Sequence, residues 1–499
     1  MTTRFAVFGF STRWQKDSVI SAVKRRNGQI VYWNLRDPAD IERCRAVFPD
    51  FESLAFTRAE NFKSDRSLFL YEAARETAEL ATMLWPSFLK SAAMHDVDRS
   101  GLDAHAVFYT QIGIALSILE RTKPDVLLFG NVPTGFVPYA CYLIGRKRGL
   151  TVRILRRVLL PGINNLSLIS DSIENAAPIE KLYRAAIESG AHTRAVELPN
   201  DMASHLATLR SATDTESASP DYFKEKVKFN KRDSGIRGPG LNFPRAFFYS
   251  IFRGQHRRSL GGFDTVLSLV RRHRLYRQYH ALTTTPSLDV PYIYVPLHFQ
   301  PEASTVPNGG VFAHQHFMVD LLSKTAPEGW RIYVKEHPSQ LLYYYPNKLF
   351  RSRRYYAELA DYPNVSLLPI SAPSNVSLIR NAKAVATVTG HSGWEAINWG
   401  TPALAFGFPW YGACDGVHRV YDAKSLQSAF TRVRDGGRPD PRKIALYLSL
   451  IRRHVIVGEY RAKADEIDAQ AENHINRLAE AICNSMPEPA TAVPQPLTG

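Results

Sequence analysis

Short apolar runs alternate with amphipathic stretches along most of this chain, and the two patterns predict different elements. The first half is expected to form strands at 5–8, 29–33, 125–129 and 151–155 and helices at 17–25, 68–93, 104–121 and 138–147. A cap at Asp17 or Ser18 is expected to begin the first helix. This alternation predicts a parallel sheet covered by helices on both faces.

The same alternation returns in the second half. Strands are predicted at 292–296, 331–335, 365–368, 384–388 and 402–406, and helices at 311–323, 350–360, 374–381, 392–398, 440–455 and 460–483. We therefore predict an α/β protein with two Rossmann-like domains that face a cleft.

A break in the pattern divides the chain into five segments. We expect an N-terminal Rossmann-like domain at 1–215 and a C-terminal one at 291–455, joined by a basic linker or insertion at 216–290. The part of this linker that is rich in Ser, Asp, Lys and Gly is typical of a loop. A C-terminal helix at 456–486 and a Pro-rich tail at 487–499, expected to be disordered, complete the chain.

The composition is that of a globular protein with one strongly basic segment. Apolar residues make up 45% of the 499 residues, which excludes wholesale disorder. The formal net charge is +15, and residues 221–280 supply +10 of it, with 14 Lys and Arg against 4 Asp and Glu. Such a segment can face an anionic membrane, an anionic substrate or nucleic acid. We favour a membrane surface or an anionic acceptor and expect no nucleic-acid partner.

Cysteine spacing and the lack of export patterns indicate a cytoplasmic protein. The four cysteines are far apart and form no CxxC pair, so we expect neither a disulfide framework nor a structural zinc site. No signal-peptide pattern is present, and no run approaches the ~18 apolar residues of a membrane span. We expect no cofactor and no essential metal.

Candidate chemistry follows the predicted strands, because open α/β sheets bind ligands at the carboxyl ends of their strands. The first candidate is Lys335-Glu336-His337-Pro338, directly after the strand at 331–335. Pro338 disfavours a helical His337, so the imidazole is expected at the sheet edge, where it and Lys335 can bind phosphate. The alternative is a structural histidine beside a surface lysine.

The second candidate is a small-residue turn between the strand at 384–388 and the next helix. Its members are Thr389, Gly390, His391, Ser392 and Gly393. The glycines permit a close backbone approach, and the N–H groups that begin the helix can hold an anion. Glu395 has two interpretations that stay open: it forms an S-x-x-E capping box with Ser392, or it binds the ribose hydroxyls of a nucleotide.

Two further loops are expected to face the cleft from opposite domains. The loop after 292–296 carries His298 and Glu302, and we take Glu302 as the candidate general base, with His298 as its substitute or support. A solvated carboxylate paired with a Lys or Arg is the alternative for Glu302. The loop at 130–135 follows the strand at 125–129, and a plain strand-to-helix turn explains it equally well.

Three stretches of the second half resemble the bacterial capsule polysaccharide biosynthesis proteins. They are VPLHFQPEAST (295–305), YVKEHP (333–338) and TVTGHSGWEAINWGTPALAFG (387–407). The resemblance covers about residues 290–410 and implies a GT-B glycosyltransferase, in a group that includes Kdo transferases, which uses a nucleotide-activated sugar.

The same resemblance implies roles for individual residues. His337 and Pro338 match the His-Pro pair that contacts the donor nucleotide's phosphate, and Ser392, Gly393 and Glu395 match the turn that holds the nucleotide. The histidine before Ser392 departs from the pattern, since relatives more often have a small residue there. The first 290 residues match no family motif, so no catalytic acid or base is carried over from them.

The resemblance therefore implies a glycosyltransferase that builds a bacterial capsule or surface polysaccharide, peripheral on the inner membrane. The favoured donor is a CMP-sugar such as CMP-Kdo, because CMP-sugar enzymes have His-Pro motifs, and the acceptor is a glycan or lipid-linked glycan. Two alternatives remain open. One is a nucleotide-sugar epimerase of the same fold, and the other is a non-catalytic module that binds membrane or nucleic acid through 221–280.

We predict that the segment 221–280 draws the protein to anionic lipid or to an anionic acceptor. Changing Arg257, Arg258, Arg271 and Arg272 to Gln is expected to reduce co-sedimentation with anionic liposomes at low salt, because each charge near the surface contributes up to about 1 kcal/mol. Neutral liposomes are the control. A wild-type protein that ignores anionic liposomes would contradict the membrane interpretation.

Overall fold

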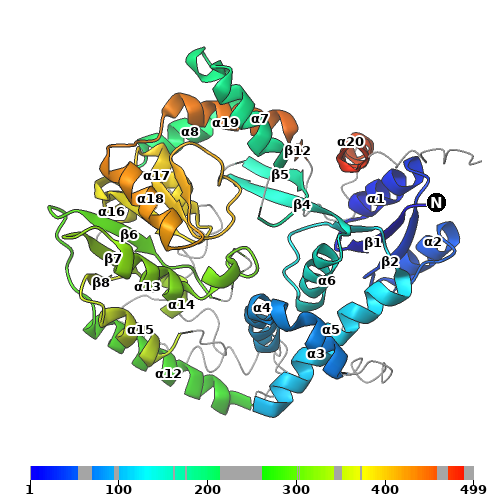
Figure 1. Ribbon diagram of the computed structural model, residues 1–499, viewed down its shortest axis with the longest axis horizontal. Helices are drawn as coiled ribbons and strands as arrows, with labels where there is room; N and C mark the ends of the chain where they lie inside the picture. Colours follow the sequence, from blue (N-terminus) through cyan, green and yellow to red (C-terminus); the bar gives the residue numbers. More distant parts are fainter. Residues whose placement is uncertain are drawn as a thin grey trace, which may run out of the picture.

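Two six-stranded sheets, each flanked by helices, form the protein (Figure 1). This computed structural model describes residues 2–53, 70–94, 101–160, 163–174, 177–213, 261–300, 302, 304–341, 351–370, 374–457 and 470–487. Most of the expected linker, through residue 260, and the expected tail after residue 487 lie outside the described residues. Two of the arginines in the liposome prediction, Arg257 and Arg258, also lie outside them.

The first sheet has the strand order β12-β5-β4-β3-β1-β2. Its parallel strands are β1 (Arg4–Phe8), β2 (Gln29–Trp33), β3 (Val126–Phe129) and β4 (Thr151–Leu160). β4 continues past the predicted end at residue 155 and returns as the antiparallel strand β5 (Ile163–Ser170), which pairs with β12 (Ile456–Val457). The predicted strands of this sheet are parallel, as expected, and the unpredicted β5 and β12 add an antiparallel edge, since antiparallel neighbours need only a short turn and no crossover helix.

Helices lie on both faces of this first unit. They are α1 (Arg13–Arg25), α2 (Pro38–Val47), α3 (Leu70–Thr77), α4 (Ala81–Met94), α5 (Gly101–Thr122) and α6 (Phe136–Lys147). The first helix begins earlier than predicted, because Thr12 and Gln15 form a capping box ahead of Asp17. The helix predicted at 68–93 is divided by the 3₁₀ turn η2 (Ala78–Leu80).

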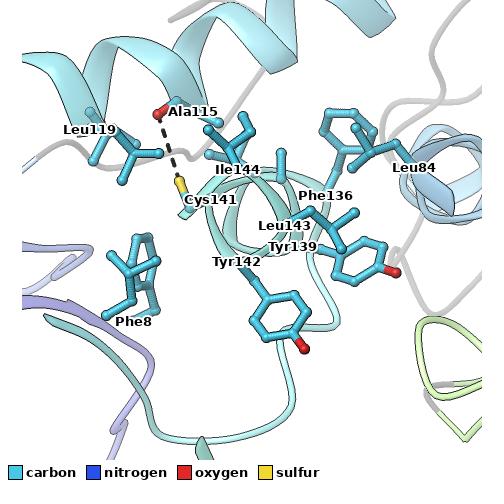
Figure 2. Packing of buried hydrophobic residues seen from close by; sticks show 14 of the residues in the cluster. Phe8, Leu84, Ala115, Leu119, Phe136, Tyr139, Cys141, Tyr142, Leu143 and Ile144 are labelled. Atoms are coloured by element: carbon cyan, nitrogen blue, oxygen red, sulfur yellow. Dashed lines mark hydrogen bonds between the residues drawn. The ribbon is translucent and has the colours of Figure 1, made fainter. Parts of the chain in front are cut away.

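Alternate residues of β1 explain why both faces need a cover. Phe5 and Val7 belong to a buried cluster with α1, whereas Ala6 and Phe8 belong to the cluster around α5 and α6. Figure 2 shows the second cluster, in which the Cys141 thiol donates to the Ala115 carbonyl at 3.8 Å. Each large apolar side chain buried in this way stabilises the fold by roughly 1.5–3 kcal/mol.

The C-terminal helix α20 (Gln470–Ser485) packs on α1, although the two helices lie near opposite ends of the chain (Figure 1). Leu478, Ala479 and Ile482 of α20 are buried in the cluster that holds α1 against the first sheet. Arg25 also donates to Asn476 at 2.6 Å. The end of the chain therefore completes the unit that the beginning of the chain starts.

The second sheet is wholly parallel and has the strand order β11-β10-β9-β6-β7-β8. Its strands are β6 (Tyr292–Pro296), β7 (Arg331–Lys335), β8 (Val365–Leu368), β9 (Ala384–Thr387), β10 (Ala403–Ala405) and β11 (Val417–Arg419). From the central pair β6 and β9 the order runs outward in both directions. This pair is a topological switch point, the place where open α/β sheets bind ligands.

The helices of the second unit agree with most predictions for this half. They are α12 (Gly261–Ala281), α13 (Gln315–Thr325), α14 (Pro338–Leu341), α15 (Arg353–Ala360), α16 (Asn375–Asn381), α17 (His391–Asn398), α18 (Ala423–Arg434) and α19 (Pro441–His454). The predicted helix 311–323 starts later, because residues 310–313 form the 3₁₀ turn η4 (Gly310–Ala313). No helix in the ranges described here is long and apolar enough to span a bilayer.

A shared apolar cluster joins the two units. After β5, the helices α7 (Ala177–Glu188) and α8 (Asn200–Ser211) pack against α19 and α17, with the 3₁₀ turn η3 (Ala191–Thr193) between them. Leu206 and Trp394 are among the side chains buried there. Polar contacts reinforce it, since Trp399 donates to the Leu209 carbonyl at 2.7 Å and the buried Arg156 of β4 donates to the Phe408 carbonyl.

Candidate functional site

The loops that leave β6 and β9 meet at the switch point of the second sheet. His298 lies beside the last residue of β9, with 3.0 Å between its Nε2 and the Thr387 Oγ1. The Thr389 N–H donates to the same imidazole nitrogen at 3.3 Å, and the Gly390 N–H donates to the Thr387 hydroxyl at 3.0 Å. The Thr387 hydroxyl therefore donates to Nε2, which leaves the imidazole proton on Nδ1.

His298 is thereby fixed as a neutral side chain. It is 7% exposed, and burial, followed by the charges of His337 and Arg351, lowers its pKa to about 3. Gln315 holds its backbone on both sides, accepting from the His298 N–H at 2.6 Å and donating to the His298 carbonyl at 3.1 Å. Because Nε2 accepts hydrogen bonds from both the Thr387 hydroxyl and the Thr389 N–H, it stabilises the turn at 387–390.

The turn after β9 leaves no room for side chains at two positions. A Cβ atom on Gly390 would lie 2.6 Å from the Thr387 hydroxyl and 3.1 Å from the His298 ring, and one on Gly393 would overlap the Tyr411 hydroxyl. The Tyr411 hydroxyl also donates to the Gly390 carbonyl. This tight packing holds the first N–H groups of α17 at the carboxyl edge of the sheet, where they can bind an anion.

The capping-box interpretation of Glu395 is wrong. α17 begins at His391 with Gly390 as its N-cap, so Ser392 lies inside the first turn and not at the capping position. Within the described part of the chain, no hydrogen bond reaches the Glu395 carboxylate, and burial raises its pKa to about 7. Glu395 therefore does not cap α17, and it interacts electrostatically with Tyr294 and Tyr411.

Lys335, at the end of β7, is buried rather than a surface lysine. It is 6% exposed and donates to the Asn375 Oδ1 at 2.9 Å, and the Tyr294 hydroxyl donates to the same oxygen at 3.0 Å. Burial lowers the Lys335 pKa to about 8. The amine thus lies beside the start of α16, next to the switch point.

Glu336 and Arg351 form a buried ion pair beneath His337. The Arg351 Nε donates to the Glu336 Oε2 at 2.9 Å, with side chains 4% and 0% exposed, and the Tyr356 hydroxyl donates to the same oxygen at 2.7 Å. The other oxygen accepts from the His337 N–H at 2.8 Å. Arg351 also donates to the His298 carbonyl at 3.1 Å, so one guanidinium ties together the loops after β6 and β7.

This arrangement fixes the backbone of His337 while its imidazole remains half-buried. Pro338 begins the short helix α14, as its missing N–H permits. The His337 ring lies 6.0 Å from that of Phe299. Sequence reasoning missed Arg351, because nothing in the run RSRRYY at 351–356 distinguishes a buried arginine from its exposed neighbours.

Glu302 lies between the two units. The Ser304 hydroxyl donates to its Oε2 at 2.7 Å, and the Thr389 hydroxyl donates to the Ser304 carbonyl at 2.5 Å. Lys90 of α4 interacts with Glu302 electrostatically. Lys90 also donates to the carbonyls of Val306 at 3.0 Å and of Thr134 at 3.4 Å, so the loop 130–135 of the first unit reaches the same place.

A cavity of about 420 Å³ separates other parts of the two units. It lies between α4 and α5 of the first unit and the η4–α13 region of the second. Its walls are mainly apolar and aromatic, and include Trp85, Phe108, Tyr109, Val311 and Phe317. Pro86, another wall residue, precedes Lys90 by one turn of α4.

Metal ligation has no support in the described ranges. There, no three His, Cys, Asp or Glu side chains gather as a metal ion would require. Asp96 and Asp98 have Asp-x-Asp spacing, which is typical of a metal motif, and both lie outside the described residues. The expectation of no essential metal is therefore untested at this pair.

The buried ion pair gives a testable prediction about stability. Changing Arg351 to Met is expected to lower the free energy of unfolding by about 3–5 kcal/mol, because it leaves the Glu336 carboxylate buried and unpaired. Urea unfolding measures the change, with the exposed Arg354→Met as control. Adding Glu336→Gln is expected to recover part of the loss, and a double variant no more stable than Arg351→Met would contradict this account.

Comparison with known proteins gives one family match. Residues 270–442, about a third of the chain, match the family model described as capsule polysaccharide biosynthesis protein. No curated protein matches the chain. The matched residues contain β6 to β11, and with them both loops of the switch point.

Solved structures show weaker likenesses. The beta Kdo 2,7 transferase KpsC of Thermosulfurimonas dismutans is 17% identical, with 43% of this chain and 61% of that chain covered and a TM-score of 0.25. The beta Kdo 2,4 transferase KpsC of the same organism is 12% identical, with 65% and 87% covered and a TM-score of 0.26. A UDP-GlcNAc 2-epimerase from Methanocaldococcus jannaschii is 12% identical, with 91% and 98% covered and a TM-score of 0.24.

The chain thus spans less than two thirds of the first of these structures. The fold assignment rests on this chain's own strand order, and the family assignment on the matched segment. Residues 270–442, which include most of the second α/β unit, are similar to the capsule polysaccharide biosynthesis proteins.

Proposed function

We propose that the protein is a glycosyltransferase that moves a sugar from a nucleotide-activated donor to a bacterial capsule or surface polysaccharide. The observation that carries this proposal is the β6–β9 switch point, where α17 with Glu395 begins after β9 and His337 follows the adjacent strand β7. These groups suit the anionic and hydroxylated parts of a nucleotide sugar. The capsule biosynthesis family match over the same segment agrees with this chemistry.

The donor is proposed to bind the second unit, 291–455. The Ser392 N–H and the side chain of His337 would face the phosphate, and Glu395 would accept from the ribose hydroxyls. Gly393, whose own N–H donates to the Gly390 carbonyl at 3.1 Å, would keep this turn packed against Tyr411. Thr389, Gly390 and Lys335 would shape the site, and Pro338 would fix the direction in which the chain leaves β7. A CMP-sugar such as CMP-Kdo is our favoured donor.

The acceptor is proposed to bind the first unit, 1–215, as a glycan or lipid-linked glycan. The apolar cavity between the units supports this assignment, because its aromatic walls include Trp85, Phe108 and Tyr109 of the first unit. In this proposal the enzyme works in the cytoplasm, and the segment 221–280 holds it at the inner membrane.

Glu302 is proposed as the general base that accepts the proton of the acceptor hydroxyl. It lies in the loop after β6, at the contact with the first unit, and receives a hydrogen bond from Ser304 at 2.7 Å. His298 would support Glu302 indirectly. The His298 Nε2 accepts from the Thr389 N–H, and the Thr389 hydroxyl donates to the Ser304 carbonyl, two residues after Glu302.

The test of this function measures binding and transfer separately on the full chain. Thermal shifts with CMP, UDP, GDP and their sugars identify the donor, because a ligand that binds the native state raises the unfolding temperature. Product analysis with and without acceptor glycan follows. Sugar transfer that requires the acceptor supports the proposal, whereas a donor altered without any acceptor would identify an epimerase and overturn it.

For the donor site, His337→Ala is expected to weaken nucleotide binding by about 10- to 150-fold while the protein stays folded. The loss corresponds to one charge-assisted hydrogen bond of roughly 1.5–3 kcal/mol. Isothermal titration with the donor nucleotide measures it, and the exposed His454→Ala is the matched control. Unchanged affinity in a folded variant would remove His337 from the site.

For the base, Glu302→Gln is expected to lower turnover by ~10²-fold or more while donor affinity stays near normal, since the change removes the charge but keeps the size of the side chain. Steady-state kinetics with acceptor present give both quantities. The exposed Glu328→Gln serves as control. Turnover near the wild-type value would limit Glu302 to a structural or binding role.

A further inference from the structure

Lys90 is a buried cation at the contact between the two units. It is 9% exposed, and its Nζ donates to the Val306 carbonyl of the second unit at 3.0 Å and to the Thr134 carbonyl of the first at 3.4 Å. Its helix neighbours Leu84 and Phe88 are buried in the apolar core. Burial therefore lowers the Lys90 pKa to about 8, and the electrostatic interaction with Glu302 opposes this effect.

Stability alone gives no reason for a lysine at this position. Two neutral carbonyls compensate poorly for the desolvation of an ammonium group, and an apolar side chain of similar length would fill the same space at lower cost. The charge is useful only to an anion nearby, and Glu302 is the carboxylate with which it interacts.

The bond to Val306 also places the Glu302 loop. The N–H groups of Thr305 and Val306 donate to the Glu302 carbonyl at 3.3 Å and 3.1 Å, so these residues lie close to Glu302. A lysine bound to the Val306 carbonyl therefore holds this loop against α4, and its bond to Thr134 holds it against the loop after β3.

We infer that Lys90 is a positioning residue for Glu302: its hydrogen bonds hold the Glu302 loop where the acceptor-side unit meets the donor-side unit, and its charge attracts the carboxylate. This inference rests on the proposed function, because Glu302 needs a fixed position only if it removes a proton from the acceptor. Lys90 contacts neither substrate in this account and acts through Glu302 alone.

A double-mutant cycle on the full chain tests the role. Lys90→Met is expected to lower kcat by about tenfold or more with donor KM nearly unchanged, and Lys90→Arg to retain most of the wild-type kcat. In the Glu302→Gln background, Lys90→Met is expected to change kcat by less than about threefold, because the group it positions is already gone. The exposed Lys147→Met of α6 is the control.

The possible results separate the positioning role of Lys90 from the proposed transferase function. Multiplicative losses in the double variant, a defect confined to donor KM, or no rescue by arginine in a folded protein would overturn the role of Lys90 alone. Absence of acceptor-dependent transfer by the wild-type protein would overturn the proposed function and this role with it. If Lys90→Met does not fold, Lys90→Gln replaces it with the same expectation, since it removes the charge but can still donate to the carbonyls.

Discussion

The candidate site depends on one imidazole that cannot take up a proton. His298 accepts hydrogen bonds at Nε2 from the Thr387 hydroxyl and the Thr389 N–H, and it can do so only while that nitrogen is bare. Burial keeps it so, because its pKa falls to about 3. The path of the chain from β9 into α17, and with it the direction of the first N–H groups of that helix, follows from this neutral contact.

A second constraint operates one strand further along the sheet. The carboxylate of Glu336 is surrounded by Arg351, Tyr356 and the His337 N–H, so the loop after β7 has a single polar arrangement. Arg351 carries the constraint to β6 through the His298 carbonyl. The loops of β6, β7 and β9 thus hold one another, and half-buried groups such as His337 and Glu395 project from a rigid edge.

The sequence predicted five of the six strands of the second unit, because each of the five is a short apolar run, whereas β11, with the sequence VHR, was not predicted. β6, β7 and β8 have the predicted bounds. The pattern could not reveal β5, whose sequence INNLSLIS mixes polar and apolar residues and whose pairing is decided by the hairpin with β4. Local periodicity also gave no sign that α20 returns to α1, because that packing joins residues from opposite ends of the chain.

The motifs and their positions relative to the predicted strands indicated the loops of the candidate site. They did not indicate the buried residues that hold these loops in place. Lys335, His337 and Glu302 were chosen as candidates because they lie at or soon after the ends of predicted strands. Lys90 and Arg351 were missed, since a charged residue in a helix or after a loop is exposed by default and only tertiary packing shows otherwise.

The return of α20 to the first unit has a consequence for synthesis on the ribosome. Domains usually fold as they emerge, starting from the N-terminus. Here the apolar face of α1 that receives Leu478 and Ile482 must wait until α20 has been made. The first unit therefore remains incomplete while the second is translated, and the emergence of α20, rather than the end of the first sheet, marks the point at which this protein can close its N-terminal core.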